Sequence, residues 1–139
     1  MTKAGLLKLN YICGRCPQEN TILILTEVSL NDFDLKALQF RTPKHFRVIH
    51  TNLSGKGSGI IILATKEITK IHQPLVSDCV TKGRTSHTRV KLSSNEELVI
   101  YSVYLSHDDR SAIRQLNDLQ NHIFLIPLEK SAYIHVQYP

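Results

Sequence analysis

The stretch GIIILAT at residues 59–65 is apolar over almost its whole length and is rich in β-branched side chains. A run of this kind is typical of a strand that is buried on both faces of a sheet. The stretch ILILT at residues 22–26 has the same character and predicts a second central strand. Both strands need apolar cover on two sides, so the chain has to supply further layers of sheet or helix.

Outward from these two runs, apolar and alternating segments predict about seven strands, and the C-terminal tail is a candidate for one more. The further candidates are 4–12, which ends near Asn10, then 46–50, 67–71, 88–92, 97–105 and the tail 132–136. The polar segment 77–87 contains Gly83 and favours a loop, and Asn95-Glu96 favours a hairpin turn before 97–105. Short connections of this kind imply largely antiparallel pairing.

Two segments carry helix signals. Asn31 is a good N-cap residue, with Asp34 in the first turn and Leu35 and Leu38 spaced for one side of a short helix. A longer helix begins near Asp108 and places four apolar residues on one face, namely Ile113, Leu116, Leu119 and Ile123. The chain is therefore predicted to be α+β, a mainly antiparallel β-sheet with one or two helices.

Composition limits the classes of protein to consider. The 139 residues are enough for one domain, and 42% hydrophobic with 21% charged residues is globular usage. No apolar run approaches the roughly 18 residues of a membrane-spanning helix, and the N-terminus lacks a secretory signal, so we expect no membrane association. Three cysteines do not make a secreted disulfide framework, which favours an intracellular protein, nuclear or cytoplasmic. A net charge of +5 favours a polyanionic partner.

Two short motifs contain residues that could carry chemistry. Gly55, Gly57 and Gly59 are followed by a strand rather than a helix, which favours a plain loop over a phosphate-binding one, and no other motif indicates a small-molecule cofactor. The Cys13-Gly-Arg-Cys16 pair could be a redox pair, with Arg15 lowering a thiol pKa, or half a zinc site completed by Cys79 and His72. Structural or incidental thiols are the preferred interpretation.

Polar residues also follow three predicted strands. Glu27 comes directly after ILILT, Tyr104 ends the longest strand candidate, and Asn10 ends the first. If these strands are neighbours, the three side chains meet at one rim of the sheet, where a carboxylate can hold a hard cation. Ordinary polarity at strand ends is the alternative.

The order of three segments resembles the first half of the endonuclease/exonuclease/phosphatase family, and most closely the endonuclease domains of LINE-type (non-LTR) retrotransposons. These segments are ILILTEVSL (22–30), SGIIILATKEI (58–68) and GRTSHTRVKLSSNEELVIYSVYL (83–105). The matching motifs are Thr26-Glu27, the strand from Gly59, Gly83-Arg84, and Tyr104-Leu-Ser-His107 in place of Tyr-x-Pro-Asn. The resemblance covers roughly residues 5–107 and implies part of a two-sheet sandwich with helices outside.

The resemblance also implies a reaction. Members of this family hydrolyse phosphodiesters with the help of Mg²⁺, which neutralises charge on the phosphate and on the leaving oxygen. By analogy, Glu27 would hold Mg²⁺, and the catalytic positions would be Asn10, Tyr104 and His107. Arg84 and Arg89 would contact a nucleic-acid backbone, DNA in particular.

The sequence departs from the family pattern in ways that predict little or no catalysis. The later Gly-Asp-x-Asn motif, a distant aspartate and a final Ser-Asp-His are absent, which indicates a single C-terminally truncated domain over residues 1–139. The interval from Asn10 to Glu27 is too short for the usual first helix. One carboxylate binds Mg²⁺ weakly unless phosphates share it. The alternative is a basic nucleic-acid-binding module without catalysis, in which Arg84 and Arg89 make the contacts.

Overall fold

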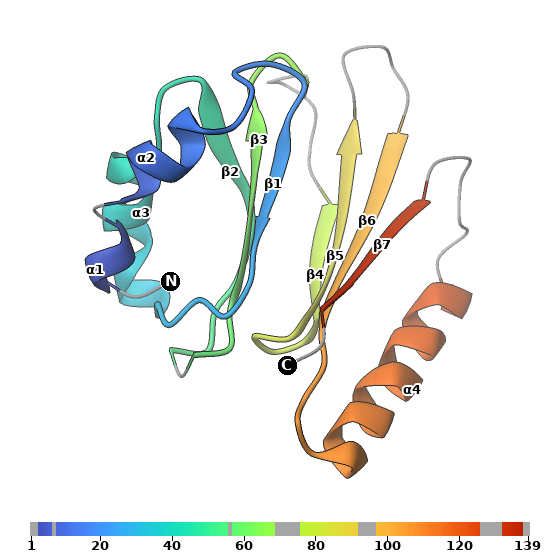
Figure 1. The fold of residues 1–139 in the computed structure, drawn as a ribbon. Coiled ribbons are helices and arrows are strands. Elements are labelled where there is room, and N and C mark those ends of the chain that lie inside the picture. Colours follow the sequence, from blue (N-terminus) through green and yellow to red (C-terminus); the bar gives the residue numbers. More distant parts are fainter. Residues whose placement is uncertain are drawn as a thin grey trace.

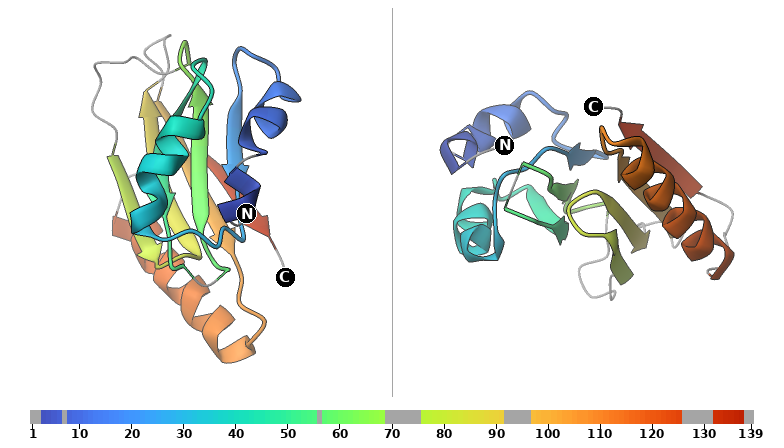
Figure 2. Two further views of the ribbon diagram at one scale, coloured as in Figure 1. Left: turned by 90° about the vertical axis from the view of Figure 1, so that its left-hand side faces the viewer. Right: turned by 90° about the horizontal axis from the view of Figure 1, so that it is seen from below.

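The computed structural model describes residues 3–6, 8–55, 57–68, 76–91, 97–125 and 132–137. It shows an α+β fold in which two sheets pack face to face and helices cover their outer sides (Figure 1). The view from below shows the same succession of helix, sheet, sheet and helix (Figure 2). Both faces of the two apolar strands are covered by this arrangement.

The first sheet has the strand order β1-β3-β2 and is antiparallel throughout. Its strands are β1 (Ile22–Leu25), β2 (Phe46–Asn52) and β3 (Ile60–Thr65). The prediction that 59–65 forms a central strand is confirmed, since all six residues of β3 are buried. The prediction that 22–26 is central was wrong: β1 lies at the edge and is only half-buried, although helices cover one of its faces and the second sheet the other.

The second sheet has the order β4-β5-β6-β7. Its strands are β4 (Val76–Thr81), β5 (Thr85–Lys91), β6 (Glu97–Tyr104) and β7 (Ala132–Gln137). The pairs β4–β5 and β5–β6 are antiparallel, whereas β7 returns parallel to β6 after a helical crossover. The predicted strands 88–92, 97–105 and 132–136 are confirmed over their described residues, and the Asn95-Glu96 turn lies outside the described part.

Two local predictions for this half of the chain were wrong. Residues 77–87 are not a loop, because β4 and the start of β5 occupy them and only 82–84 form the turn. Their polar side chains hid the edge strand of this sheet, in which the consecutive residues Ser77, Asp78 and Cys79 are exposed on both faces. In the predicted strand 67–71, Glu67 and Ile68 belong to a turn, and 69–71 lie outside the described residues.

The first helical layer covers the outer face of the first sheet. It consists of α1 (Lys3–Leu6), α2 (Leu9–Gly14), the 3₁₀ turn η1 (Asp32–Asp34) and α3 (Leu35–Arg41). The strand predicted over 4–12 was wrong, because the buried Leu6, Leu9 and Cys13 are spaced three and four apart, as on one face of a helix. The predicted cap at Asn31 is confirmed: its side chain accepts from the Phe33 N–H at 2.9 Å, and Asp34 accepts from the Asn31 N–H at 3.0 Å.

The long helix α4 (Asp109–Leu125) covers the outer face of the second sheet (Figure 1). Asp108 caps it by accepting from the Ser111 N–H at 2.9 Å. The helix was predicted correctly but its buried face only in part: Leu119 is buried as predicted, whereas Ile113 is 60% and Leu116 46% exposed, and the side chain of Ile123 lies outside the described residues. Beside Leu119 the helix turns two polar side chains, Gln115 and His122, toward the sheet.

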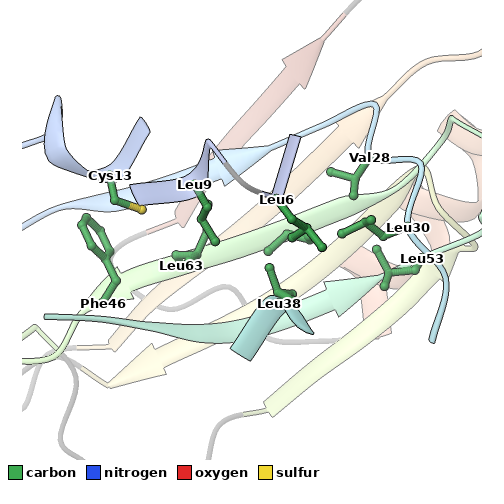
Figure 3. Close-up of a cluster of buried hydrophobic side chains, with 10 residues drawn as sticks. Leu6, Leu9, Cys13, Val28, Leu30, Leu38, Phe46, Leu53 and Leu63 are labelled. Atoms are coloured by element: carbon green, nitrogen blue, oxygen red, sulfur yellow. The ribbon is translucent and has the colours of Figure 1, made fainter. Parts of the chain in front are cut away.

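Three apolar clusters hold these layers together. The first joins the helices to the first sheet, with Leu9, Cys13 and Leu38 packed near Leu63 (Figure 3). The second lies between the sheets and includes Ile60, Ile62, Ala64, Val90 and Ile100. The third joins α4 to the second sheet and consists of Val99, Tyr101, Val103, Leu105 and Leu119, with Ala112 packed against them.

One buried side chain also links the two sheets by hydrogen bonds. Asn52, at the end of β2 and 1% exposed, donates to the carbonyls of Thr81 at 3.0 Å and Thr85 at 3.1 Å. Its Oδ1 accepts from the Gly83 N–H at 2.6 Å. Gly83 has a φ of +73°, and a Cβ there would lie 2.1 Å from the Ser58 carbonyl oxygen. The β4–β5 turn is thereby held in one position against the first sheet.

Candidate functional site

The strands that precede Glu27 and Tyr104 end at one rim, where the two sheets meet. Tyr104 is the last residue of β6, and Glu27 follows β1 after Thr26. The Tyr104 hydroxyl donates to Glu27 Oε1 at 2.7 Å, which joins side chains 77 positions apart. Glu27 has a φ of +57°, in the left-handed region that residues with a side chain rarely occupy. Backbone of this kind is concentrated at functional sites.

Arg84 belongs to the same rim. It follows Gly83 in the β4–β5 turn, and its main-chain carbonyl accepts from the Tyr104 N–H at 2.7 Å. Its guanidinium donates to the Leu105 carbonyl at 3.2 Å and lies 4.9 Å from the centre of the Tyr104 ring. Glu27, Tyr104 and Arg84 therefore form one cluster, which we call the rim cluster.

The hydrogen bond to Glu27 raises the pKa of Tyr104, and partial burial acts in the same direction, whereas Arg84 opposes them. Tyr104 therefore keeps its proton at neutral pH. Its hydroxyl serves as a donor to the Glu27 carboxylate, which in turn stays oriented toward the rim.

Beside the rim cluster lies a cavity of about 260 Å³. Arg84 and Arg114 supply positive charge to its lining, the hydroxyls of Ser106 and Ser111 supply hydrogen-bonding groups, and Asp118 lies in the same wall. Guanidinium and hydroxyl groups are the donors that proteins commonly present to phosphate oxygens.

Gln115 positions this cavity and was not foreseen from the sequence. It is 3% exposed, its Nε2 donates to the Tyr104 carbonyl at 3.0 Å, and its Oε1 accepts from the Ser106 N–H at 2.9 Å. A buried glutamine on a helix face otherwise marked by leucine and isoleucine has no distinguishing signal in one sequence. Its function emerges only when α4 is placed against the end of β6.

The structure places the other predicted site residues elsewhere. Asn10 lies exposed on α2, in the helical layer, and not at a strand end, so its predicted place beside Glu27 was wrong. His107 lies exposed in the loop between β6 and α4. Arg89 lies in the middle of β5 and forms an ion pair with Glu97 at 2.8 Å, away from the rim cluster.

The Cys13–Cys16 pair does not have the geometry of a redox centre. Cys13 is fully buried against the first sheet, and burial, with the neighbouring Cys16 acting in the same direction, raises its pKa to about 11. Arg15, expected to lower a thiol pKa, instead lies over the Tyr11 ring at 5.3 Å. Cys79 is exposed on β4 in the other sheet, and His72 lies outside the described residues.

The rim cluster offers one carboxylate to a cation such as Mg²⁺. Within the described ranges, Glu27 does not join two other histidine, cysteine or acidic side chains closely enough to enclose an ion. Mg²⁺ is commonly held by one or two carboxylates together with waters and substrate phosphates. The donor set therefore fits an ion shared with a bound phosphate, and Glu27 is the residue that would hold it.

Elsewhere the structure joins Asp78, His87 and His122, a group that sequence spacing did not single out. The two histidines lie 35 positions apart, and no close ligand pair marks either of them. Asp78 and His87 come together through the register between β4 and β5, which sets them opposite each other and which the sequence alone does not give.

Comparisons with known proteins add no assignment: no family model, no curated protein and no solved structure matches this chain. Among the described helices, none has the length and apolar character needed to cross a membrane.

Proposed function

We propose that this chain is a nucleic-acid-binding domain of the endonuclease/exonuclease/phosphatase type that binds backbone phosphate at the rim cluster and does not hydrolyse it. The observation that carries the proposal is the 2.7 Å hydrogen bond from Tyr104 to Glu27, with the Arg84 guanidinium over the same tyrosine ring. The resemblance in motif order supports it, as does the packing of two sheets between helices. DNA is the expected target.

The charges around the rim indicate how a phosphate would bind. Arg84 and Arg114 line one cavity and can donate charge-assisted hydrogen bonds to the phosphate oxygens. The Glu27 carboxylate would repel the same phosphate unless a cation lies between them. We therefore expect Mg²⁺ to strengthen binding, with Glu27 and the nucleic-acid phosphate as its shared ligands.

The placement of the remaining family positions supports a site that does not hydrolyse the phosphate. A hydrolytic site needs a general base to activate water and further groups that stabilise the charge that develops on the phosphate. Asn10 lies on α2, and His107 is exposed in the loop after β6. In the described part of the chain, the rim cluster therefore offers binding groups without a positioned base.

The second candidate is a basic module that binds nucleic acid without any metal. The cavity with its two arginines favours this alternative, because arginine and hydroxyl donors alone can hold a phosphate. The two candidates differ in one measurable property, which is the effect of Mg²⁺ on affinity.

The test is a fluorescence anisotropy titration of the whole chain with a labelled DNA duplex, in Mg²⁺ and in EDTA at equal ionic strength. We expect Mg²⁺ to tighten binding, Glu27→Gln to abolish that gain, and Arg84→Gln to weaken binding about tenfold. Arg41→Gln, which removes the same charge from an exposed position on α3, is the matched control and should bind as the original chain does. Binding that ignores Mg²⁺ but needs Arg84 would select the second candidate.

A plasmid-cleavage assay with Mg²⁺ tests the absence of catalysis. Intact plasmid is the expected result. Cleavage that disappears in a Glu27→Ala variant would show that the rim cluster is a working nuclease site, and the non-hydrolytic part of the proposal would then be abandoned.

A further inference from the structure

A second cluster of potential ligands lies on the other face of the second sheet, beneath α4. Asp78 on β4 pairs directly with His87 on β5, and His87 pairs directly with Tyr101 on β6. Residues directly opposite each other on neighbouring strands project to the same side of a sheet. The three side chains therefore form one row across the sheet, and His122 of α4 reaches down onto it.

Two of the three distances within this cluster match those between neighbouring ligands of a metal ion. Asp78 Oδ2 lies 3.3 Å from His87 Nδ1 and 3.4 Å from His122 Nε2, and the three ligand atoms all lie within 4.8 Å of one another. Zinc bonds to nitrogen and oxygen are roughly 2.0–2.2 Å long, so neighbouring ligands of a tetrahedral ion lie roughly 3.3–3.6 Å apart. Hydrogen bonds from an imidazole to a carboxylate are normally shorter, at roughly 2.7–2.9 Å.

We propose that Asp78, His87 and His122 bind one transition-metal ion of the Zn²⁺ class, which fastens α4 to the second sheet. Two imidazole nitrogens and one carboxylate oxygen select such an ion over Mg²⁺ or Ca²⁺, which prefer oxygen ligands. This inference does not depend on the proposed nucleic-acid binding, because none of the three residues belongs to the rim cluster.

The surroundings of the ligands fit this function. The Tyr101 hydroxyl lies 3.2 Å from His122 Nδ1 and can accept a hydrogen bond from an Nδ1–H, which leaves Nε2 as the metal ligand. His87 is fully buried, and its ring packs against those of Tyr101 and His122, with ring centres 5.0 Å and 4.8 Å away, which fixes its orientation.

Exposure differs across the three ligands and leaves the site open on one side. The side chain of His122 is 18% exposed and that of Asp78 is 50% exposed. Three protein ligands with solvent access leave a coordination position for water or for an exchangeable ligand. A closed structural site would instead have four protein ligands.

The test is a calorimetric titration of the whole EDTA-treated chain with Zn²⁺, followed by the visible spectrum of the Co²⁺ form. We expect one ion per chain and a Co²⁺ spectrum without thiolate charge-transfer bands. Asp78→Asn and His122→Gln change partly exposed side chains and should each weaken Zn²⁺ binding by more than about 100-fold, whereas Tyr101→Phe should weaken it about tenfold.

Two controls make the result specific. Asp109→Asn removes the same charge from an exposed position on α4 and should leave Zn²⁺ binding unchanged. A chain with Cys16→Ser and Cys79→Ser should also retain it, because the proposed ligands include no thiol. The proposal is overturned if Zn²⁺ fails to bind in a 1:1 ratio, if Asp78→Asn and His122→Gln bind as well as the original chain, or if the cysteine variant loses binding.

Discussion

Replacement of Asn52 by alanine tests how the two sheets are joined. Asn52 is 1% exposed, and its amide contacts the carbonyls of Thr81 and Thr85 and the N–H of Gly83. Asn52→Ala removes all of these partners at once and leaves the Gly83 N–H buried without an acceptor from this side chain. One buried group left unpaired costs about 1–3 kcal/mol, and each net hydrogen bond lost adds about 1 kcal/mol.

We therefore expect Asn52→Ala to lower the free energy of unfolding by about 3 kcal/mol, a large part of the 5–15 kcal/mol that is typical of a domain. Urea unfolding followed by far-UV circular dichroism measures this loss, and the midpoint should fall by about 1.5 M if the slope stays near 2 kcal/mol per molar. Asn117→Ala, at an exposed position on α4, is the matched control and should change stability by less than about 0.5 kcal/mol.

Asn52→Asp separates hydrogen bonding from volume, because aspartate has nearly the same shape but cannot donate. Its oxygens would face the Thr81 and Thr85 carbonyls, and a charge would be buried between the sheets. Asn52→Asp should thus be at least as unstable as Asn52→Ala. If the free energy of unfolding of Asn52→Asp lies within about 0.5 kcal/mol of that of the original chain, the hydrogen bonds of Asn52 do not hold the β4–β5 turn in place, and the reasoning fails. Since the same turn carries Arg84, Asn52→Ala should also weaken DNA binding in the anisotropy assay.

Three further predictions concern burial. Desolvation lowers the pKa of His50 from 6.5 to about 4, so the unfolded chain takes up this proton first as the pH falls. The unfolding free energy should lose about 3 kcal/mol between pH 6.5 and pH 4 from this residue, and urea titrations across that range should show a shallower pH dependence in His50→Gln. Leu119→Ala should lower the free energy of unfolding by about 2–3 kcal/mol and Leu116→Ala by less than about 0.5 kcal/mol, because Leu119 faces the sheet and Leu116 does not. Equal losses in urea unfolding would contradict the placement of α4. At pH 8, a chromogenic disulfide reagent should modify Cys79 readily and Cys13 only on unfolding, and prompt modification of Cys13 would show that α2 is not docked.

The parts of the fold that were predictable are those where one force decides. The run IIILA at residues 60–64 has no polar residue to expose, so hydrophobic burial alone assigns it to the middle of a sheet, as observed for β3. Asn31 could be read as a cap because the N-cap interaction is local and needs only Phe33 and Asp34. Neither prediction depended on the rest of the chain.

Predictions failed where tertiary contacts compensated for an unfavourable local pattern. The strand β5 buries Ser86 and His87 completely, and polar residues of this kind indicated a loop. On α4 the apolar spacing favoured Ile113 and Leu116, yet the helix buries Gln115 because this side chain satisfies the Tyr104 carbonyl and the Ser106 N–H. A hydrogen-bonding partner that is distant in sequence decided the orientation, and a periodicity argument does not include such partners.

The same distinction separates the two candidate sites. The meeting of Glu27 and Tyr104 was predicted for strands that are neighbours in one sheet, but β1 and β6 belong to different sheets, and the two side chains meet where these sheets come together. The cluster of Asp78, His87 and His122 required a strand hidden in a polar segment, the register between β4 and β5, and the rotation of α4 about its own axis. The misjudged helix face and the missed metal ligands therefore have a single cause, because the rotation that exposes Leu116 is the one that brings His122 over the sheet. A Zn²⁺ titration of the Leu119→Ala chain tests this common cause. If α4 docks through Leu119, the substitution should loosen the helix and weaken Zn²⁺ binding, although no ligand has changed.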